Sequence, residues 1–289
     1  MSQGFEINRI LFPTDFSGAA DKAEHHVVNM AKCMGSKLTL LHVFESSSYS
    51  MFGRSNGADS EVLDAIREKV NSKAADLNSL HGIDVDVVFD TGRIYDQIVS
   101  VAQDLDADLI MMGTHGVSGF AEFFAGSNAF KVVTQSPCPV LTIQEARESE
   151  GYKNIVLPMD TTNDSRQKVV HAMFLAKKFG STLHISNLIS DDDPQVRHVF
   201  GIKEKQITDV LEAEEIPYTI ANLVGDNLAT MTMNHAESKK ADLIIMMTEQ
   251  EYNMTGFLMG QFAQQIVNHS KIPVMSVSPD DHSDGFHFS

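Results

Sequence analysis

The chain has two cysteines, Cys33 and Cys138, and their positions match neither a zinc-ligand spacing nor a disulfide framework. We therefore expect both thiols to be reduced and structural. The sequence also lacks an apolar run long enough to span a bilayer, and its first residues lack the basic and apolar regions of a signal peptide. These absences predict a cytoplasmic protein that has no membrane partner.

Basic residues are scarce as well. Lys and Arg number 22 against 39 Asp and Glu, which gives a formal net charge of -17, and the sequence contains no run of basic residues. A protein with this charge is a poor candidate for binding nucleic acid or an anionic membrane through general electrostatics. If the protein binds a phosphate group, we expect local backbone N–H groups to hold it.

The sequence motifs of fast phosphoryl transfer are also missing. We find no Walker sequence with its Lys and Ser/Thr pair, no nucleophile beside a base and no paired carboxylates. Without a basic residue over the γ-phosphate, the transfer step would gain little charge stabilisation. Any hydrolysis of ATP should therefore be slow, and the sequence assigns no catalytic residue.

The chain does contain a repeat of itself. Ile10–Asp15 has the pattern of a short buried strand that ends in a polar turn, with Asp15 and Ser17 placed to cap the helix that follows. Ile155–Asp160 repeats the strand and its turn. The helical patterns that follow end at Gly35 and Gly180, at the same offset of 145 positions, while later elements match at offsets of 133 or 134. A length of 289 residues with 43% hydrophobic content fits two domains of ordinary size.

Each half alternates strands with helices in the order βαβαβαβαβ. Such alternation predicts parallel strands joined by right-handed crossovers. The expected fold class is α/β, with two tandem doubly wound, mostly parallel five-stranded sheets that are Rossmann-like and have helices on both faces. Ligands of such sheets bind beyond the carboxyl ends of the strands, where the strand order reverses. We expect Asp15 and Gly113, which follow the first and fourth strands, to lie on that edge.

A glycine-rich stretch carries the strongest functional signal. It follows an apolar run and contains Gly113, Gly116 and Gly126, after which come Ser127 and Asn128. A strand that leads through a glycine turn into a helix forms an anion site, because backbone N–H groups and the positive end of the helix dipole converge there. Glycines let the backbone approach phosphate, and the Ser and Asn side chains add donors. This stretch predicts a phosphate-binding loop.

The spacing of this stretch resembles the motif of the universal stress proteins: glycine, two residues, glycine, nine residues, then glycine, serine and asparagine. The resemblance covers nearly the whole chain as two tandem domains and implies the adenine nucleotide alpha-hydrolase-like fold. Family members with this motif bind ATP, usually with a divalent metal such as Mg²⁺, so it also implies ATP binding by the first domain. The implied nucleotide-binding residues are Pro13, Thr14, Asp15, Val43, Met112, Gly113, His115, Gly116, Gly126, Ser127 and Asn128. Adenine is expected near Val43, with the triphosphate over the glycines and the metal ligands unassigned.

The second half departs from the motif. In an ungapped alignment of the two halves, only one of the three motif glycines has a glycine as its counterpart, Gly260. The other two glycines align with Met247 and Gln250, and the Ser and Asn positions align with Gln261 and Phe262. The resemblance thus implies a first domain at 1–146 with an intact motif, a second at 147–280 with a degenerate one, and a polar tail at 281–289. Domains of this family commonly pair through their last strands. Val140–Ile143 and Val274–Val277 are therefore expected to form an internal pseudo-dimer, and a homodimer is a further option.

Several interpretations stay open from the sequence alone. Asp15 has a counterpart, Asp160, in the half that lacks the glycines, which favours helix capping as strongly as ligand binding. His115 lies inside the motif and could contact phosphate or face solvent. The leading hypothesis is an ATP-binding regulatory protein of the stress response. The alternatives are a slow ATPase or autophosphorylating enzyme, and a nucleotide-free scaffold or small-ligand binder.

Overall fold

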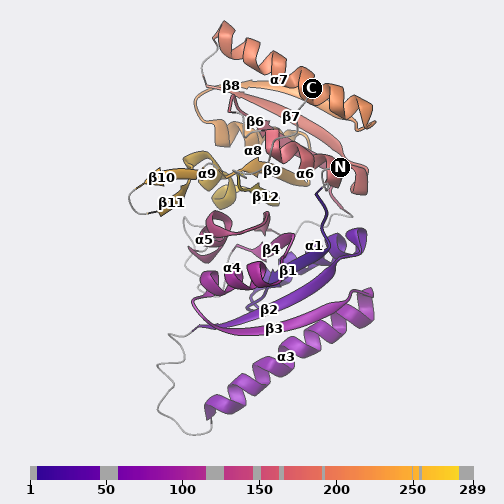
Figure 1. Cartoon of the computed structure of the whole chain (residues 1–289), viewed down its shortest axis with the longest axis vertical. Coiled ribbons are helices and arrows are strands. Elements are labelled where there is room, and N and C mark those ends of the chain that lie inside the picture. The colour runs from indigo at the N-terminus through magenta and orange to yellow at the C-terminus, as the bar shows by residue number, and fades with distance from the viewer. Residues whose placement is uncertain are drawn as a thin grey trace. The chain divides into compact units, whose positions relative to one another are not determined.

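A computed structural model describes residues 5–45, 58–114, 127–145, 151–162, 166–190, 193–248, 250–253 and 256–279 (Figure 1). The chain forms two compact units. The first unit runs from Ile7 to Ala146, and the second takes Arg147 onwards together with Phe5 and Glu6. The domain limits at 146 and 280 stay predictions, and the tail at 281–289 lies outside the described residues.

The first unit contains a parallel sheet. Its strands, in chain order, are β1 (Arg9–Pro13), β2 (Lys37–Glu45), β3 (Val85–Gly92), β4 (Leu109–Gly113) and β5 (Val140–Ile143). They lie in the order β3-β2-β1-β4-β5, and each pair of neighbours is parallel. The strand order reverses between β1 and β4, which confirms the predicted doubly wound α/β fold.

Helices cover both faces of this sheet. They are α1 (Gly18–Met34), α3 (Ala58–His81), α4 (Ile94–Asp104) and α5 (Ser127–Gln135). Helix α1 packs against α3, and α4 packs against α5. The chain steps from β1 through β2 to β3 in one direction across the sheet, and then returns to β4 and β5 in the other. Because right-handed crossovers in opposite directions place their helices on opposite faces, α1 and α3 cover one face and α4 and α5 cover the other. Figure 1 shows α3 lying along the outer strand β3.

Local sequence signals explain where α1 begins and ends. The Ser17 side chain caps its first turn by accepting a hydrogen bond from the Ala20 N–H at 3.3 Å. The helix ends at Gly35, whose φ of 70° lies in the left-handed region that glycine adopts most easily. Both ends agree with the sequence-based prediction. Helix α3 also has apolar side chains outside its buried face. Among them, Val62 is 59% exposed and Leu80 is 74% exposed.

The second unit repeats the topology of the first. Its sheet contains β6 (Asn154–Met159), β7 (Thr182–Ile189), β8 (Tyr218–Val224), β9 (Leu243–Met247) and β12 (Val274–Val277). The order is β12-β9-β6-β7-β8, again with parallel neighbours. The helices are α6 (Gln167–Phe179), α7 (Pro194–Ala213), α8 (Leu228–Ser238) and α9 (Gln261–His269).

The repeat extends to individual hydrogen bonds. Thr114 follows β4 and donates its N–H to the carbonyl of Ile143 at 3.1 Å, while Thr248 follows β9 and donates to Val277 at 2.8 Å. Both threonine side chains are buried, at 2% and 1% exposure. The two halves therefore share the same construction at the carboxyl end of the fourth strand.

The sequence analysis missed a short antiparallel hairpin in the second unit, made of β10 (Gln250–Asn253) and β11 (Gly256–Met259). It occupies the part of the second half that aligns with the residues between Gly116 and Gly126. Strands of four residues are too short for their alternation to be read from sequence.

Of the helices that the structure describes, none combines the length and the apolar character that a transmembrane span needs.

Candidate functional site

The carboxyl ends of β1 and β4 lie next to each other at the switch point of the first sheet. The two strands pair in parallel, with Leu11 opposite Ile110. Asp15 follows the end of β1, and Gly113 is the last residue of β4. The expectation that these two residues share one edge of the sheet is therefore confirmed.

Residues Pro13–Ser17 form what we call the strand-end turn. The Oδ1 atom of Asp15 accepts a hydrogen bond from the Ser17 N–H at 2.9 Å, and Thr14 Oγ1 accepts from the Phe16 N–H at 3.2 Å. Phe16 has a φ of 58°, which closes the turn before α1 begins. Asp160 makes the equivalent bond in the second unit, to the Thr162 N–H at 2.7 Å. This shared bond gives Asp15 a structural role, while its exposed carboxylate can still accept from a ligand.

His42, in β2, fixes the turn to the neighbouring strand. Thr14 donates its N–H to the carbonyl of Leu41 at 2.9 Å, and His42 Nδ1 lies 2.8 Å from the carbonyl oxygen of Thr14. Because a carbonyl oxygen can only accept, Nδ1 carries the proton. Burial lowers the pKa of His42, so the ring is neutral at pH 7 and Nε2 is an acceptor. Sequence reasoning passed over His42, although it adjoins the predicted Val43.

Gly113 is required by packing as well as by any ligand. A Cβ atom built on it would lie 2.5 Å from the carbonyl oxygen of Ala19, in the first turn of α1. The absence of a side chain lets α1 begin against the end of β4. The structure thus gives a reason for the first glycine of the motif that the sequence analysis did not supply.

The remaining predicted residues divide into those that the structure places and those that it does not. Pro13 is half-buried at the end of β1, and Val43 is half-buried within β2, two residues before its end. Met112 is 7% exposed in β4, and Asn128 is half-buried in the first turn of α5. Ser127 opens α5, and its side chain is not described. His115, Gly116 and Gly126 lie outside the described residues.

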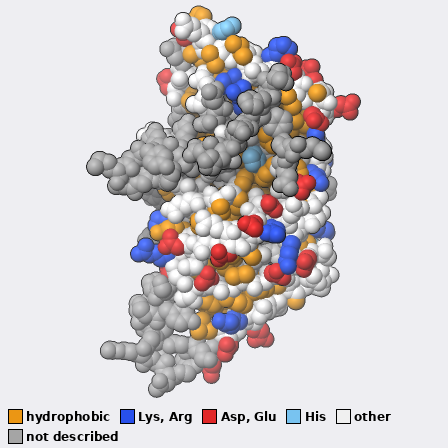
Figure 2. Space-filling view, in the orientation of Figure 1, with side chains coloured by type: hydrophobic (Ala, Val, Ile, Leu, Met, Phe, Trp, Pro, Cys, Tyr) orange, Lys and Arg blue, Asp and Glu red, His pale blue; other side chains and the backbone are white. Residues whose placement is uncertain are grey.

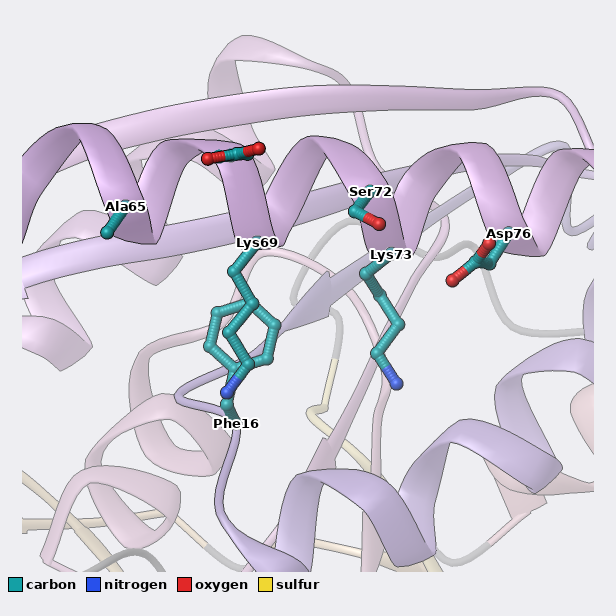
Figure 3. Close-up of a pocket in the computed structure, with 7 residues that line it drawn as sticks. Phe16, Ala65, Lys69, Ser72, Lys73 and Asp76 are labelled. Atoms are coloured by element: carbon teal, nitrogen blue, oxygen red, sulfur yellow. The ribbon is translucent and has the colours of Figure 1, made fainter.

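A shallow groove of about 410 Å³ lies between the strand-end turn and α3 (Figure 3). It is lined by Phe16, Ala65, Glu68, Lys69, Ser72, Lys73 and Asp76. The Lys69 ammonium stands 4.2 Å from the centre of the Phe16 ring, and Lys73 donates to Glu24 at 2.5 Å. The groove shares only Phe16 with the strand-end turn, and none of the residues predicted from the glycine motif lines it.

The charged side chains on the face drawn in Figure 2 are of both signs. Figure 2 shows Lys and Arg side chains interspersed with Asp and Glu on the visible face. In the described ranges, no group of three or more His, Cys, Asp or Glu is arranged to hold a metal ion. The Lys69 ammonium, over the Phe16 ring, is a described cation beside the strand-end turn.

Two doubly wound units, one of which carries a glycine-rich stretch at its switch point, define a tandem Rossmann-like protein. The sequence profile of the universal stress protein family matches residues 6–144 and 151–278, so the chain belongs to that family as a tandem of two of its domains. A universal stress protein of Synechocystis sp. is 34% identical over 134 residues, which cover 46% of this chain and 83% of the relative. One from Methanocaldococcus jannaschii is 28% identical over 152 residues, 47% of this chain and 94% of the relative.

Solved structures show the same fold over nearly the whole chain. A universal stress protein from Archaeoglobus fulgidus has a TM-score of 0.77 at 20% identity and covers 96% of this chain and 100% of its own. A putative universal stress protein from Pseudomonas aeruginosa has a TM-score of 0.67 at 17% identity, covering 95% and 94%. At these identities the likeness establishes the fold alone.

Proposed function

We propose that the first unit binds ATP, that the second does not, and that the protein serves as a nucleotide-regulated member of the universal stress protein family. One observation carries the proposal: the full glycine spacing from Gly113 to Asn128 occurs in only one of two units that are otherwise built alike. Family membership supports it, because members with this motif bind ATP.

The described residues fit such a ligand. The Asp15 carboxylate is exposed and uses Oδ1 within the turn, so Oδ2 can accept from a ribose hydroxyl or hold a metal-bound water. Val43 lies in β2 directly after His42, which contacts the strand-end turn, and there its backbone can face an adenine edge. Helix α5 begins directly after the glycine stretch, and the N–H groups of its first turn, which have no partner within the helix, can offer positive charge to phosphate. Bound Mg²⁺ would offset part of the triphosphate charge.

The test exchanges the residues that differ between the units. Ser127→Gln with Asn128→Phe gives the first unit the pair found at the start of α9, where Gln261 is exposed and Phe262 half-buried. The same fold already accommodates this pair, so the variant should fold normally. The mirrored variant, Gln261→Ser with Phe262→Asn, serves as the matched control.

The measurement is calorimetric titration of ATP, ADP and AMP with Mg²⁺, with circular dichroism to check folding. Wild type and the mirrored variant should bind one ATP per chain, and the first-unit variant should bind none. Two sites per chain would show that the second unit binds ATP as well. Loss of binding only in the mirrored variant would show that the second unit binds instead of the first. No heat from wild type, together with no nucleotide in native mass spectra, would favour the scaffold alternative.

A further inference from the structure

Strand β8 is the outermost strand of the second unit. The strand order of that unit ends at β8, and among the described strands only β7 pairs with it (Figure 1). Its counterpart in the first unit, at the offset of 133, is β3, where the strand order of that unit also ends. An edge strand directs part of its backbone N–H and C=O groups away from the sheet, where a strand of another chain can pair with them.

The backbone of β8 alternates between the two sides of the strand. Leu183 in β7 donates its N–H to the carbonyl of Pro217 at 2.9 Å, and Gly225 donates to the carbonyl of Ile189 at 3.0 Å. Because successive residues of a strand direct these groups to opposite sides, the odd-numbered residues of β8 face β7. The residues whose N–H and C=O groups point away from β7 are Tyr218, Ile220, Asn222 and Val224.

The two edge strands differ in charge. Strand β3 contains Asp86 and Asp90, whereas β8 contains no charged residue and has Thr219 and Leu223 at the corresponding positions. The Asp86 side chain is 55% exposed and binds Lys37 at 2.6 Å. Charged residues on an edge strand are a common protection against pairing between molecules. The first unit has this protection on its edge strand, and the second unit lacks it.

An antiparallel contact between two copies of β8 brings no like charges together. A two-fold axis through Ala221 pairs all seven residues of the strand and sets Thr219 of each copy opposite Leu223 of the other. The same register in β3 would set Asp86 opposite Asp90. Like charges directly opposite each other in a sheet are destabilising. Strand β8 is therefore complementary to itself, whereas β3 is not.

Apolar side chains of β8 are exposed on one face of the strand. Ile220 is 37% exposed and Val224 is 49% exposed, and both lie on the same face as Tyr218 because side chains alternate along a strand. In this register Tyr218 lies opposite Val224 of the other copy, and an aromatic residue opposite a β-branched one stabilises a sheet. Pairing would bury these side chains and give the outward backbone groups hydrogen-bond partners.

We propose that β8 is the contact through which two copies of this chain associate, by antiparallel pairing about a two-fold axis through Ala221. Each copy contributes the same strand, so the assembly closes as a dimer. The charged residues nearest to β8 along the chain, Glu215 and Asp226, lie outside the seven paired residues. The contact does not depend on nucleotide, because it rests on the edge strand of the second unit alone.

Analytical ultracentrifugation of the full-length protein over a series of concentrations tests the contact. Wild type should sediment as a dimer, and a protein that is monomeric at every concentration overturns the proposal. Thr219→Asp with Leu223→Asp gives β8 the carboxylates of β3 and sets like charges opposite each other in the dimer. We expect the dissociation constant of the dimer to rise about tenfold or more. A dimer that persists unchanged in this variant also overturns the proposal.

A charge exchange identifies the strand that each copy contacts. Thr219→Lys with Leu223→Lys should weaken self-association as the aspartate variant does. An equimolar mixture of the two variants should regain the dimer, because each introduced carboxylate then lies opposite an introduced ammonium. Recovery in the mixture also shows that both variants are folded, whereas a mixture that stays monomeric overturns antiparallel pairing of β8.

The matched control is Thr91→Asp, which adds a carboxylate at the exposed counterpart of Val224 on β3. This variant should form the dimer as wild type does. Loss of the dimer in the control to the same extent would show that added negative charge, rather than contact at β8, weakens the association, and would overturn the proposal. Titration of ATP reports separately on the first unit, so either proposal can fail while the other stands.

Discussion

Gly113 lies so close to α1 that an added Cβ atom would stand 2.5 Å from the Ala19 carbonyl oxygen. The first glycine of the motif therefore allows the start of α1 to pack closely against the end of β4, in addition to any contact that it makes with phosphate. A loss of ATP binding caused by substitution of Gly113 would report on the fold and the ligand together, so the exchange at Ser127 and Asn128 is the cleaner probe of function.

This contact leads to a stability prediction. Gly113→Ala should lower the free energy of unfolding by about 2 kcal/mol, because the contacting atoms are helix backbone and cannot move aside cheaply. Gly18→Ala is the control, since a Cβ atom there would meet nothing within 4 Å. Urea denaturation measures both. Equal stability of the two variants would show that α1 shifts without penalty.

The half-buried carboxylate of Asp108 gives a second prediction. Asp108 accepts with Oδ2 from the N–H groups of Asn8 and Arg9, both at 2.8 Å, and so fixes the start of β1. Asp108→Ala should cost about 2 kcal/mol, because two backbone donors lose a charged acceptor. Asp242 makes the same bonds to the start of β6 at 2.9 Å, and Asp242→Ala should cost a similar amount.

The control for this pair is Asp104→Ala, at the exposed end of α4, which should change the midpoint of thermal unfolding very little. A cost confined to only one of the two aspartates would contradict the structural equivalence of the units.

A buried histidine, His26, and a half-buried one, His171, predict a pH dependence. Burial and, second, the neighbouring His25 lower the pKa of His26 to about 4 from 6.5, and burial lowers that of its counterpart His171 to about 4. The folded state therefore favours neutral rings. As far as these two rings determine it, the free energy of unfolding is highest above pH 6.5 and decreases as the pH falls toward 4. Each ring contributes a slope of about 1.4 kcal/mol per pH unit within this window.

His26→Leu and His171→Leu should each reduce the loss of stability between pH 6.5 and 5, measured by urea denaturation at a series of pH values. His198→Gln, on the exposed side of α7, should leave the pH profile as in wild type. Parallel profiles for all four proteins would mean that the histidines are accessible to protons in the folded state.

A fourth prediction addresses the enzymatic alternative. Because the sequence places no basic residue in a Walker arrangement, incubation with ATP and Mg²⁺ should release ADP no faster than a protein-free control. Intact-mass spectra should likewise show no phosphoryl group on the protein. A clear rate that disappears in the Ser127→Gln, Asn128→Phe variant would instead assign slow ATP hydrolysis to the first unit.

The sequence was most informative where a signal is local. Buried apolar runs predicted the strands, and Ser17 and Gly35 marked the two ends of α1, because capping and left-handed backbone depend on single residue types. The repeat offsets then predicted equal topology in the two halves. The pairing of the last strands and the presence of nucleotide stay predictions.

The parts that were missed depend on residues distant in sequence. The bond from His42 in β2 to Thr14, directly after β1, joins residues that are 28 positions apart along the chain. The hairpin of β10 and β11 is too short for its alternation to stand out. A local sequence pattern does not predict which distant residues will contact each other in the folded protein.

By itself the sequence determined the α/β fold, its duplication and the half that keeps the glycine spacing, since hydrophobic periodicity, caps and glycines are properties of the chain. Only the tertiary structure decided what Gly113 contacts and that His42 lies against the carbonyl of Thr14. The physical reason is that steric exclusion and hydrogen-bond satisfaction are set by atoms brought together through folding.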